Sequence, residues 1–227
     1  MKQKFTILFD LDGTLVDTAP DLMRAHNHVM KKFGYPTKST EEIRNLVGQG
    51  AGAMLGRSIW GQAKKEFGKV QDDKIKKEMV KDFVDFYGKN IVNESTLIKG
   101  VKNFLIWCKE NKISMAVCTN KQEHLAVDLL KKIGIYDFFE YVAGHNTFEY
   151  CKPDPRHLTS IVEILGGDIK KTLMIGDSET DANAAKNAGI PVILLEDGYT
   201  EKNTSEIYHN HLVKDFIGIE KIVLKYL

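Results

Sequence analysis

The sequence predicts an α/β protein: a doubly wound parallel sheet into which an all-helical domain is inserted. From Thr96 onward, short apolar runs typical of buried strands alternate with amphipathic helical patterns. Between the first such run, at residues 5–9, and Thr96, about seventy residues show helical patterns and no strand-like run. The alternation favours a Rossmann-like core with right-handed crossovers, and the interruption favours a separate cap. We expect residues 1–16 and 91–227 to form the core and residues 17–90 to form the cap.

The opening apolar run, at residues 5–9, is expected to be a buried strand. It is followed by Asp10 and Asp12, two carboxylates separated by one residue. Gly13 then allows a tight turn that a residue with a Cβ would resist, and Thr14 adds a hydroxyl. An ordinary aspartate-rich turn is the alternative interpretation. However, two carboxylates crowded at a strand end are costly unless a cation or a proton relieves them, so the pair suggests a metal site.

Four helical patterns make up the insert. The first ends at Gly34, and the second begins after Thr40. The third follows the glycine-rich stretch VGQGAG at residues 47–52, and Asp72 could cap the fourth. The glycine-rich stretch lacks the G-x-G-x-x-G spacing and does not follow a strand, so dinucleotide binding is disfavoured. A cap loop that faces the active site is the preferred interpretation.

Four more strands are expected after Thr96, at residues 113–118, 141–143, 172–175 and 192–195. Helices are expected between and around them, near residues 105–108, 125–133, 155–165 and 182–188. In an open parallel sheet, the carboxyl ends of the strands lie along one edge, where ligands bind. Polar residues that directly follow these strands are therefore candidates for one shared site.

Three strand-like runs end in such residues. Thr119 and Asn120 follow one strand, and Asp177 follows another, with Asp181 one helical turn further on. Lys152 lies in a loop stiffened by two prolines. We expect this set to meet Asp10 and Asp12 at the sheet edge. Hard oxygen ligands of this kind suit Mg²⁺, and the ammonium of a lysine would balance the charge of a phosphate.

Four short motifs carry a family resemblance. The stretches FDLDGT, CTN, KPDP and GDSETD occur in that order at residues 9–14, 118–120, 152–155 and 176–181. Together they resemble the haloacid dehalogenase superfamily of Mg²⁺-dependent phosphohydrolases across nearly the whole chain. The longer stretches DGTLVDTAPDL, TNK and GDSETDANAAKNAG are most similar to its phosphoglycolate phosphatase branch.

The resemblance implies hydrolysis of a small phosphomonoester through an aspartyl-phosphate intermediate. It implies that Asp10 is the nucleophile and that Asp12 is the general acid and base. Thr119 and Lys152 would hold the phosphoryl oxygens. The other core residues expected to line the substrate site are Gly13, Thr14 and Asn120.

The resemblance also implies a Mg²⁺ site. Asp10, the backbone carbonyl of Asp12, and Asp177 would hold the ion. Asp181 would either support the waters on the metal or orient Lys152.

The cap is expected to select the leaving group. The expected substrate is 2-phosphoglycolate, whose carboxylate would be recognised by the loop that contains Gly48 and Gly50, together with Arg57. Sugar phosphates, nucleotides and pyrophosphate stay open as alternatives. A mutase of the β-phosphoglucomutase type is less favoured, because the position of its cap histidine is occupied by Leu22. A non-enzymatic phosphoacceptor module ranks far behind, because its acidic pair lies before the phosphorylated aspartate.

Composition sets the remaining expectations. The chain has 227 residues with 32 basic and 31 acidic side chains, so neither a nucleic-acid nor a membrane partner is expected. The absence of a signal-like start and three widely spaced cysteines favour a reduced, cytoplasmic protein. It is expected to be a monomer or a homodimer. His26 and His28 have no other ligands at useful spacing and are expected at the surface.

Overall fold

The computed structural model describes residues 4–60 and 70–227. In this part of the chain the main sheet is parallel throughout, as predicted, and β1 lies in its interior. The strands, in spatial order, are β5 (Tyr141–Ala143), β4 (Ser114–Cys118), β1 (Thr6–Phe9), β6 (Thr172–Gly176), β7 (Val192–Leu195) and β8 (His211–Val213). Thr6 lies opposite Ser114 on β4 and opposite Thr172 on β6, so the three strands end together.

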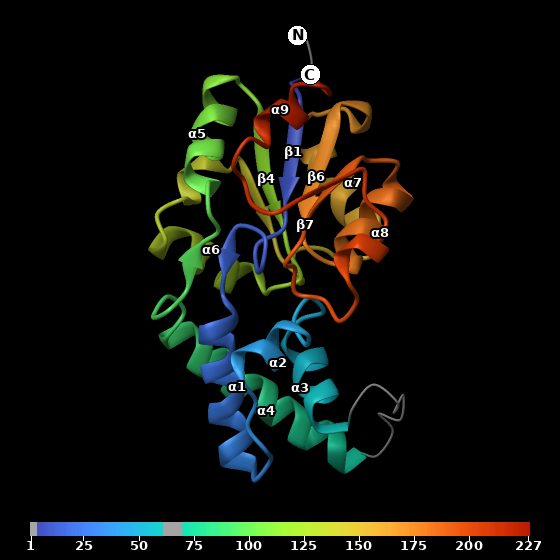
Figure 1. Cartoon of the computed structure of the whole chain (residues 1–227). Helices are drawn as coiled ribbons and strands as arrows, with labels where there is room; N and C mark the ends of the chain where they lie inside the picture. The colour runs from blue at the N-terminus through green and yellow to red at the C-terminus, as the bar shows by residue number, and fades with distance from the viewer. Residues whose placement is uncertain (1–3, 61–69) are drawn as a thin grey trace.

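Helices cover both faces of this sheet (Figure 1). They are α5 (Val101–Glu110) and α6 (Glu123–Lys132) on one face, and α7 (Arg156–Ile164) and α8 (Glu179–Ala188) on the other. Ile7 and Phe9 of β1 pack into the cluster that includes α5 and α6, whereas Leu8 packs into the cluster with α7 and α8. Successive strand residues point to opposite faces, so a strand covered on both sides must be apolar at every position. The run at 5–9 meets this requirement, and the doubly wound prediction is confirmed.

The helical insert lies beyond the carboxyl edge of the sheet (Figure 1). It contains α1 (Ala19–Phe33), α2 (Thr40–Arg44), α3 (Ala51–Trp60) and α4 (Val70–Lys89). Gly34 ends α1 in the left-handed conformation, and Ser39 with Glu42 forms a capping box that starts α2. The prediction that Asp72 caps the fourth helix is wrong, because α4 is already helical at Val70.

Two chain passages connect the cap to the core, and they pair with each other. β2 (Val16–Asp17) and β3 (Thr96–Leu97) form an antiparallel two-stranded ribbon. Asp21 at the start of α1 fastens the returning passage: its Oδ2 accepts hydrogen bonds from the backbone N–H groups of residues 93–95, at 2.9–3.0 Å. The predicted cap, residues 17–90, begins inside this ribbon and ends shortly before β3.

The rest of the described chain contains short helices, and one histidine predicted at the surface is buried. The short helices are η1 (Tyr136–Phe138), η2 (Ile169–Lys171), η3 (Thr204–Glu206) and α9 (Glu220–Val223). His26 is fully buried, contrary to the surface prediction, and its ring nitrogens lie 2.9 Å from Asn27 Oδ1 and 2.7 Å from Ser58 Oγ. No helix in the described ranges has the length and apolar character needed to cross a membrane.

Candidate active site

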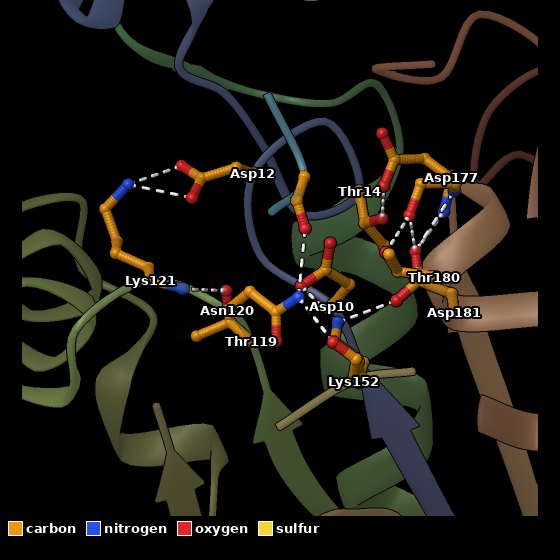
Figure 2. Close-up of polar contacts among 12 residues, drawn as sticks. Asp10, Asp12, Thr14, Thr119, Asn120, Lys121, Lys152, Asp177, Thr180 and Asp181 are labelled. Atoms are coloured by element: carbon orange, nitrogen blue, oxygen red, sulfur yellow. Dashed lines mark hydrogen bonds and ion pairs between the residues drawn. The ribbon is translucent and has the colours of Figure 1, made fainter. Parts of the chain in front are cut away.

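The carboxyl ends of β1, β4 and β6 bring the predicted polar residues together (Figure 2). Asp10 follows β1, and its backbone N–H still bonds to Ile175 O of β6 at 2.9 Å. Thr119 follows β4, and Asp177 follows β6. This convergence results from the shared register of the parallel strands, so it is set by the sheet and does not depend on flexible loops.

Lys152 is the positive centre of this group. Its side chain is 1% exposed, and Nζ lies 2.7 Å from Asp10 Oδ1 and 2.6 Å from Asp181 Oδ1. Burial alone would lower the pKa of Lys152, but the two carboxylates outweigh burial and raise it above its ordinary value. The side chain is therefore held as an ammonium at the sheet edge.

Burial also shifts the pKa values of the acidic residues around Lys152, in the direction that favours their neutral form. Burial raises the pKa of Asp10 to about 6, against the opposing charge of Lys152. Burial, followed by the nearby charges of Asp10 and Asp181, raises the pKa of Asp177 well above its ordinary value. The cluster thus carries more negative charge than Lys152 alone neutralises.

A divalent cation fits this excess. Asp10, Asp177 and Asp181 are all buried, and each offers a carboxylate oxygen within 4.8 Å of the others. Asp181 already uses both oxygens: Oδ1 accepts from Lys152, and Oδ2 accepts from Ser178 Oγ and from two backbone N–H groups. Asp177 accepts fewer bonds, one at each oxygen, so Asp10 and Asp177 could hold the ion while Asp181 stays paired with Lys152. Buried carboxylates need such compensation, and hard oxygen donors favour ions such as Mg²⁺.

Position 13 accommodates glycine but no residue with a Cβ atom. Its φ is +82°, and a Cβ there would lie 2.2 Å from Asp177 Oδ2 and 2.8 Å from the ring of Tyr199. Its neighbour Thr14 donates to Asp177 Oδ1 at 3.0 Å. Both residues thus contact the Asp177 carboxylate and its surroundings.

Asp12 sits in a different environment from Asp10. Its carboxylate accepts bonds from Lys121 Nζ at 2.6 and 2.8 Å (Figure 2). It also accepts a bond from Thr18 Oγ1 at 2.6 Å. Sequence reasoning missed Lys121 as a site residue, although the TNK stretch places it two residues after Thr119 at a strand end. Two carboxylates two residues apart thus have separate cationic partners.

A cavity of about 510 Å³ lies between the core and the cap, and both Asp10 and Asp12 line it. Its other core residues include Thr119, Asn120 and Lys121. Its cap wall includes the loop at 47–52 and the apolar side chains Leu22, Met54, Val80, Phe83 and Val84. The Asn120 amide Nδ2 donates to Gly48 O at 3.0 Å and to Lys152 O at 2.9 Å, so it connects this wall to the lysine loop.

Of the three cap residues predicted to contact substrate, two line the cavity and one does not. Gly48 and Gly50 line the cavity, and both have positive φ, +104° and +83°. Arg57 is outside its lining; the guanidinium donates to Leu46 O and, at 3.4 Å, to Val47 O. The structure therefore brings the glycine loop to the cavity and places Arg57 behind that loop.

Tyr199, which was also not predicted as a site residue, connects the acidic cluster to the two-stranded ribbon of β2 and β3. Its backbone N–H donates to Asp177 Oδ2 at 2.6 Å. Its hydroxyl donates to Asp17 Oδ1 and accepts from Ala19 N at 2.9 Å. Arg44 of α2 completes the link, with Nη2 2.7 Å from Asp17 Oδ2 and its guanidinium 5.3 Å from the Tyr199 ring centroid.

Comparison with known proteins identifies the family of this chain. A model of the haloacid dehalogenase-like hydrolases matches residues 7–195. A protein from Caulobacter vibrioides named phosphoglycolate phosphatase is 37% identical, with 98% of this chain and 92% of the relative covered. One of the same name from Mesorhizobium japonicum is 36% identical, with 92% and 90% covered.

Solved structures show the same fold. A crystal structure described as a predicted phosphoglycolate phosphatase from Haemophilus somnus superposes with a TM-score of 0.87 at 32% identity, covering 98% of this chain and 99% of that one. A β-phosphoglucomutase from Clostridium difficile reaches 0.77 at 21% identity, covering 98% and 97%, and shows likeness of fold alone. From the matched model and these relatives, the chain belongs to the haloacid dehalogenase-like hydrolase family.

Proposed function

We propose that this protein is a Mg²⁺-dependent phosphatase that hydrolyses 2-phosphoglycolate to glycolate and phosphate through an aspartyl-phosphate intermediate. The observation that supports it most is the pair of carboxylates in one cavity with separate environments. Asp10 is paired with buried Lys152, and Asp12 is paired with Lys121 and Thr18. Two like groups in different surroundings can divide two roles, and the family resemblance assigns the nucleophile to Asp10 and the general acid and base to Asp12.

In the first half of the reaction, a carboxylate oxygen of Asp10 attacks phosphorus, and the bond from phosphorus to the ester oxygen breaks. Asp12 gives its proton to the departing oxygen of glycolate. Thr119 and Lys152 hold the phosphoryl oxygens. Asp10, the backbone carbonyl of Asp12, and Asp177 would hold Mg²⁺, whose charge would lower the repulsion between nucleophile and ester.

In the second half, Asp12 takes a proton from a water molecule, which attacks phosphorus and breaks the bond to Asp10. Phosphate leaves, and both aspartates return to their starting states. Asp181 keeps Lys152 in place through both steps, since its Oδ1 lies 2.6 Å from Nζ. The cap wall excludes bulk water during transfer.

The choice of 2-phosphoglycolate is supported by the relatives of that name, which are 36–37% identical over more than 90% of this chain. The glycine loop just before α3 can bring backbone N–H groups close to a small anion. A mutase is disfavoured, because Leu22 lines the cavity where such enzymes would carry a histidine. His26, one turn further along α1, bonds to Ser58 and Asn27.

A panel of phosphorylated metabolites, assayed with Mg²⁺ and again with EDTA, tests the proposal. We expect 2-phosphoglycolate to have the highest kcat/KM, and ethyl phosphate, which lacks the carboxylate, to be a poor substrate. Activity should vanish in EDTA and return with Mg²⁺. A sugar phosphate or nucleotide that clearly outperforms 2-phosphoglycolate would overturn the substrate assignment, and full activity in EDTA would overturn the metal.

A further inference from the structure

Lys121 brings a positive charge into the cavity that the phosphoryl steps do not use. Its side chain is 5% exposed, and its ammonium lies 4.6 Å from the ring centroid of Tyr87, which belongs to cap helix α4. Lys121, Tyr87 and Asp12 all line the cavity. A charge held between a core carboxylate and a cap ring lies where the two walls meet.

The ammonium has capacity for a further partner. A lysine Nζ carries three donors, and Asp12 accepts bonds from it at 2.6 and 2.8 Å. The surroundings are largely apolar, because Leu22, Leu125 and Phe83 line the same cavity. An ion pair formed there is stronger than one formed in water.

The position of this charge selects a particular part of the substrate. If Asp12 hydrogen-bonds to the ester oxygen at about 2.7 Å, Lys121 Nζ lies at most about 5.5 Å from that oxygen. In 2-phosphoglycolate the carboxylate carbon is two bonds from the ester oxygen, so its oxygens lie roughly 3 Å from it. The carboxylate can therefore come within hydrogen-bond reach of Nζ, which makes Lys121 a group able to bind it.

We propose that Lys121 is the specificity-determining residue of the enzyme: it binds a carboxylate on the carbon adjacent to the phosphate ester. This rests on the proposed phosphatase function and names the group that selects its substrate. Arg57 is occupied by the carbonyls of Leu46 and Val47 and lies outside the cavity lining. Lys76 of α4 also lines the cavity and is the competing cation in the test.

The test measures a selectivity, defined as kcat/KM for 2-phosphoglycolate divided by kcat/KM for ethyl phosphate. We expect Lys121→Met to lower this selectivity by about 10- to 100-fold, the loss of one charged hydrogen bond. Lys121→Arg should retain most of it. Lys76→Met, the matched control, should leave it unchanged. Any effect that Lys121 exerts only through Asp12 slows both substrates alike and cancels in the ratio.

A binding measurement makes the test independent of turnover. 3-Phosphonopropionate and propylphosphonate carry a CH2 group in place of the ester oxygen, differ at the carboxylate alone, and cannot be hydrolysed as esters. Wild type should bind 3-phosphonopropionate more tightly by calorimetry in Mg²⁺, and Lys121→Met should lose that difference while keeping a cooperative thermal transition.

Three results would overturn the proposal: equal binding of the two phosphonates by wild type, an unchanged binding difference in Lys121→Met, or a loss that appears only in Lys76→Met. If wild type hydrolyses neither ester but Lys121 still controls the phosphonate difference, the proposed phosphatase function fails and the carboxylate site stands.

Discussion

The core wall and the cap wall of the cavity differ in how they are built. On the core wall, the carboxylates have cationic partners: Asp10 pairs with Lys152, which lies outside the cavity lining, and Asp12 pairs with Lys121. The cap wall consists largely of apolar side chains such as Leu22 and of the loop at 47–52, and it also includes Lys76. In the proposed reaction, the sheet edge would supply the reactive groups, and the cap wall would supply shape and exclusion of water.

The largest expected effect is on the core wall. Asp10→Asn should lower kcat by on the order of 10⁴-fold or more, because an amide cannot form the aspartyl-phosphate. Asp154→Asn is the matched control, since its carboxylate is paired with Arg156 on an exposed loop. Steady-state kinetics and a search for phosphoprotein in quenched wild type give the readout. Near-wild-type turnover by Asp10→Asn would remove the nucleophile from the mechanism.

A smaller loss of activity is expected from a change at Asp177, which forms no bond to phosphorus in the proposed reaction. Asp177→Asn should raise the Mg²⁺ concentration needed for half-maximal activity by roughly 10- to 100-fold, because a carboxylate ligand becomes a neutral amide. Excess Mg²⁺ should restore much of the rate. The measurement is a Mg²⁺ titration of activity, and an unaltered titration would show that Asp177 is not a ligand.

The acidic cluster should also make the effect of Mg²⁺ on stability depend on pH. Burial raises the pKa of Asp10 to about 6, above the unfolded value of about 3.9. Without a cation, the stability that Asp10 contributes is therefore present at low pH and is lost as pH rises through about 6. A cation binds the ionised form, so Mg²⁺ should raise Tm more at pH 7.5 than at pH 5.

Each kcal/mol of that stabilisation corresponds to about 2–4 °C for a chain of this size. Differential scanning fluorimetry with and without Mg²⁺ measures it. Asp10→Asn should lose most of the pH dependence. An equal Mg²⁺ shift at both pH values would contradict the assignment of the ion to this cluster.

The smallest expected effect tests the connection that Tyr199 makes between the acidic cluster and the β2–β3 ribbon. Tyr199→Phe removes a hydroxyl that contacts Asp17 and accepts from the Ala19 N–H at 2.9 Å. Leaving that buried N–H unpaired should cost about 1–3 kcal/mol in the free energy of unfolding. Tyr226→Phe, whose hydroxyl lies 2.9 Å from His211 Nε2 far along the chain, is the control and should cost less. Equal losses in urea unfolding would show that Tyr199 has no special role in holding the β2–β3 ribbon.

Several residues that directly follow strands could be predicted from the sequence, and the motifs added Lys152 on a loop and Asp181 on a helix. Residues that act through backbone groups could not be predicted. Asp10, Thr119 and Asp177 follow apolar runs, and parallel pairing then places them together. Tyr199 acts on Asp177 through a backbone N–H, which has no signature in residue type. The same limit applies to Arg57 of α3, since nothing in its spacing shows that its partners would be the backbone carbonyls of Leu46 and Val47.

His26 is a different case, because its helical spacing in the sequence does indicate burial. It lies four residues after Leu22 and three before Val29, on the apolar stripe of α1, and its burial follows from that spacing. Lys121 also carried a positional signal, since it comes two residues after Thr119. Its pairing with Asp12 depends on how far a flexible side chain extends, which spacing alone does not fix.

The amide of Asn120 has a consequence for turnover. One nitrogen donates both to Gly48 O in the cap loop and to Lys152 O in the core. A movement of the cap away from the core breaks the first bond and leaves the second intact. In the proposed reaction, the Lys152 loop would keep its bond to Asn120 while products depart, so the next substrate would meet a core that does not have to be reassembled.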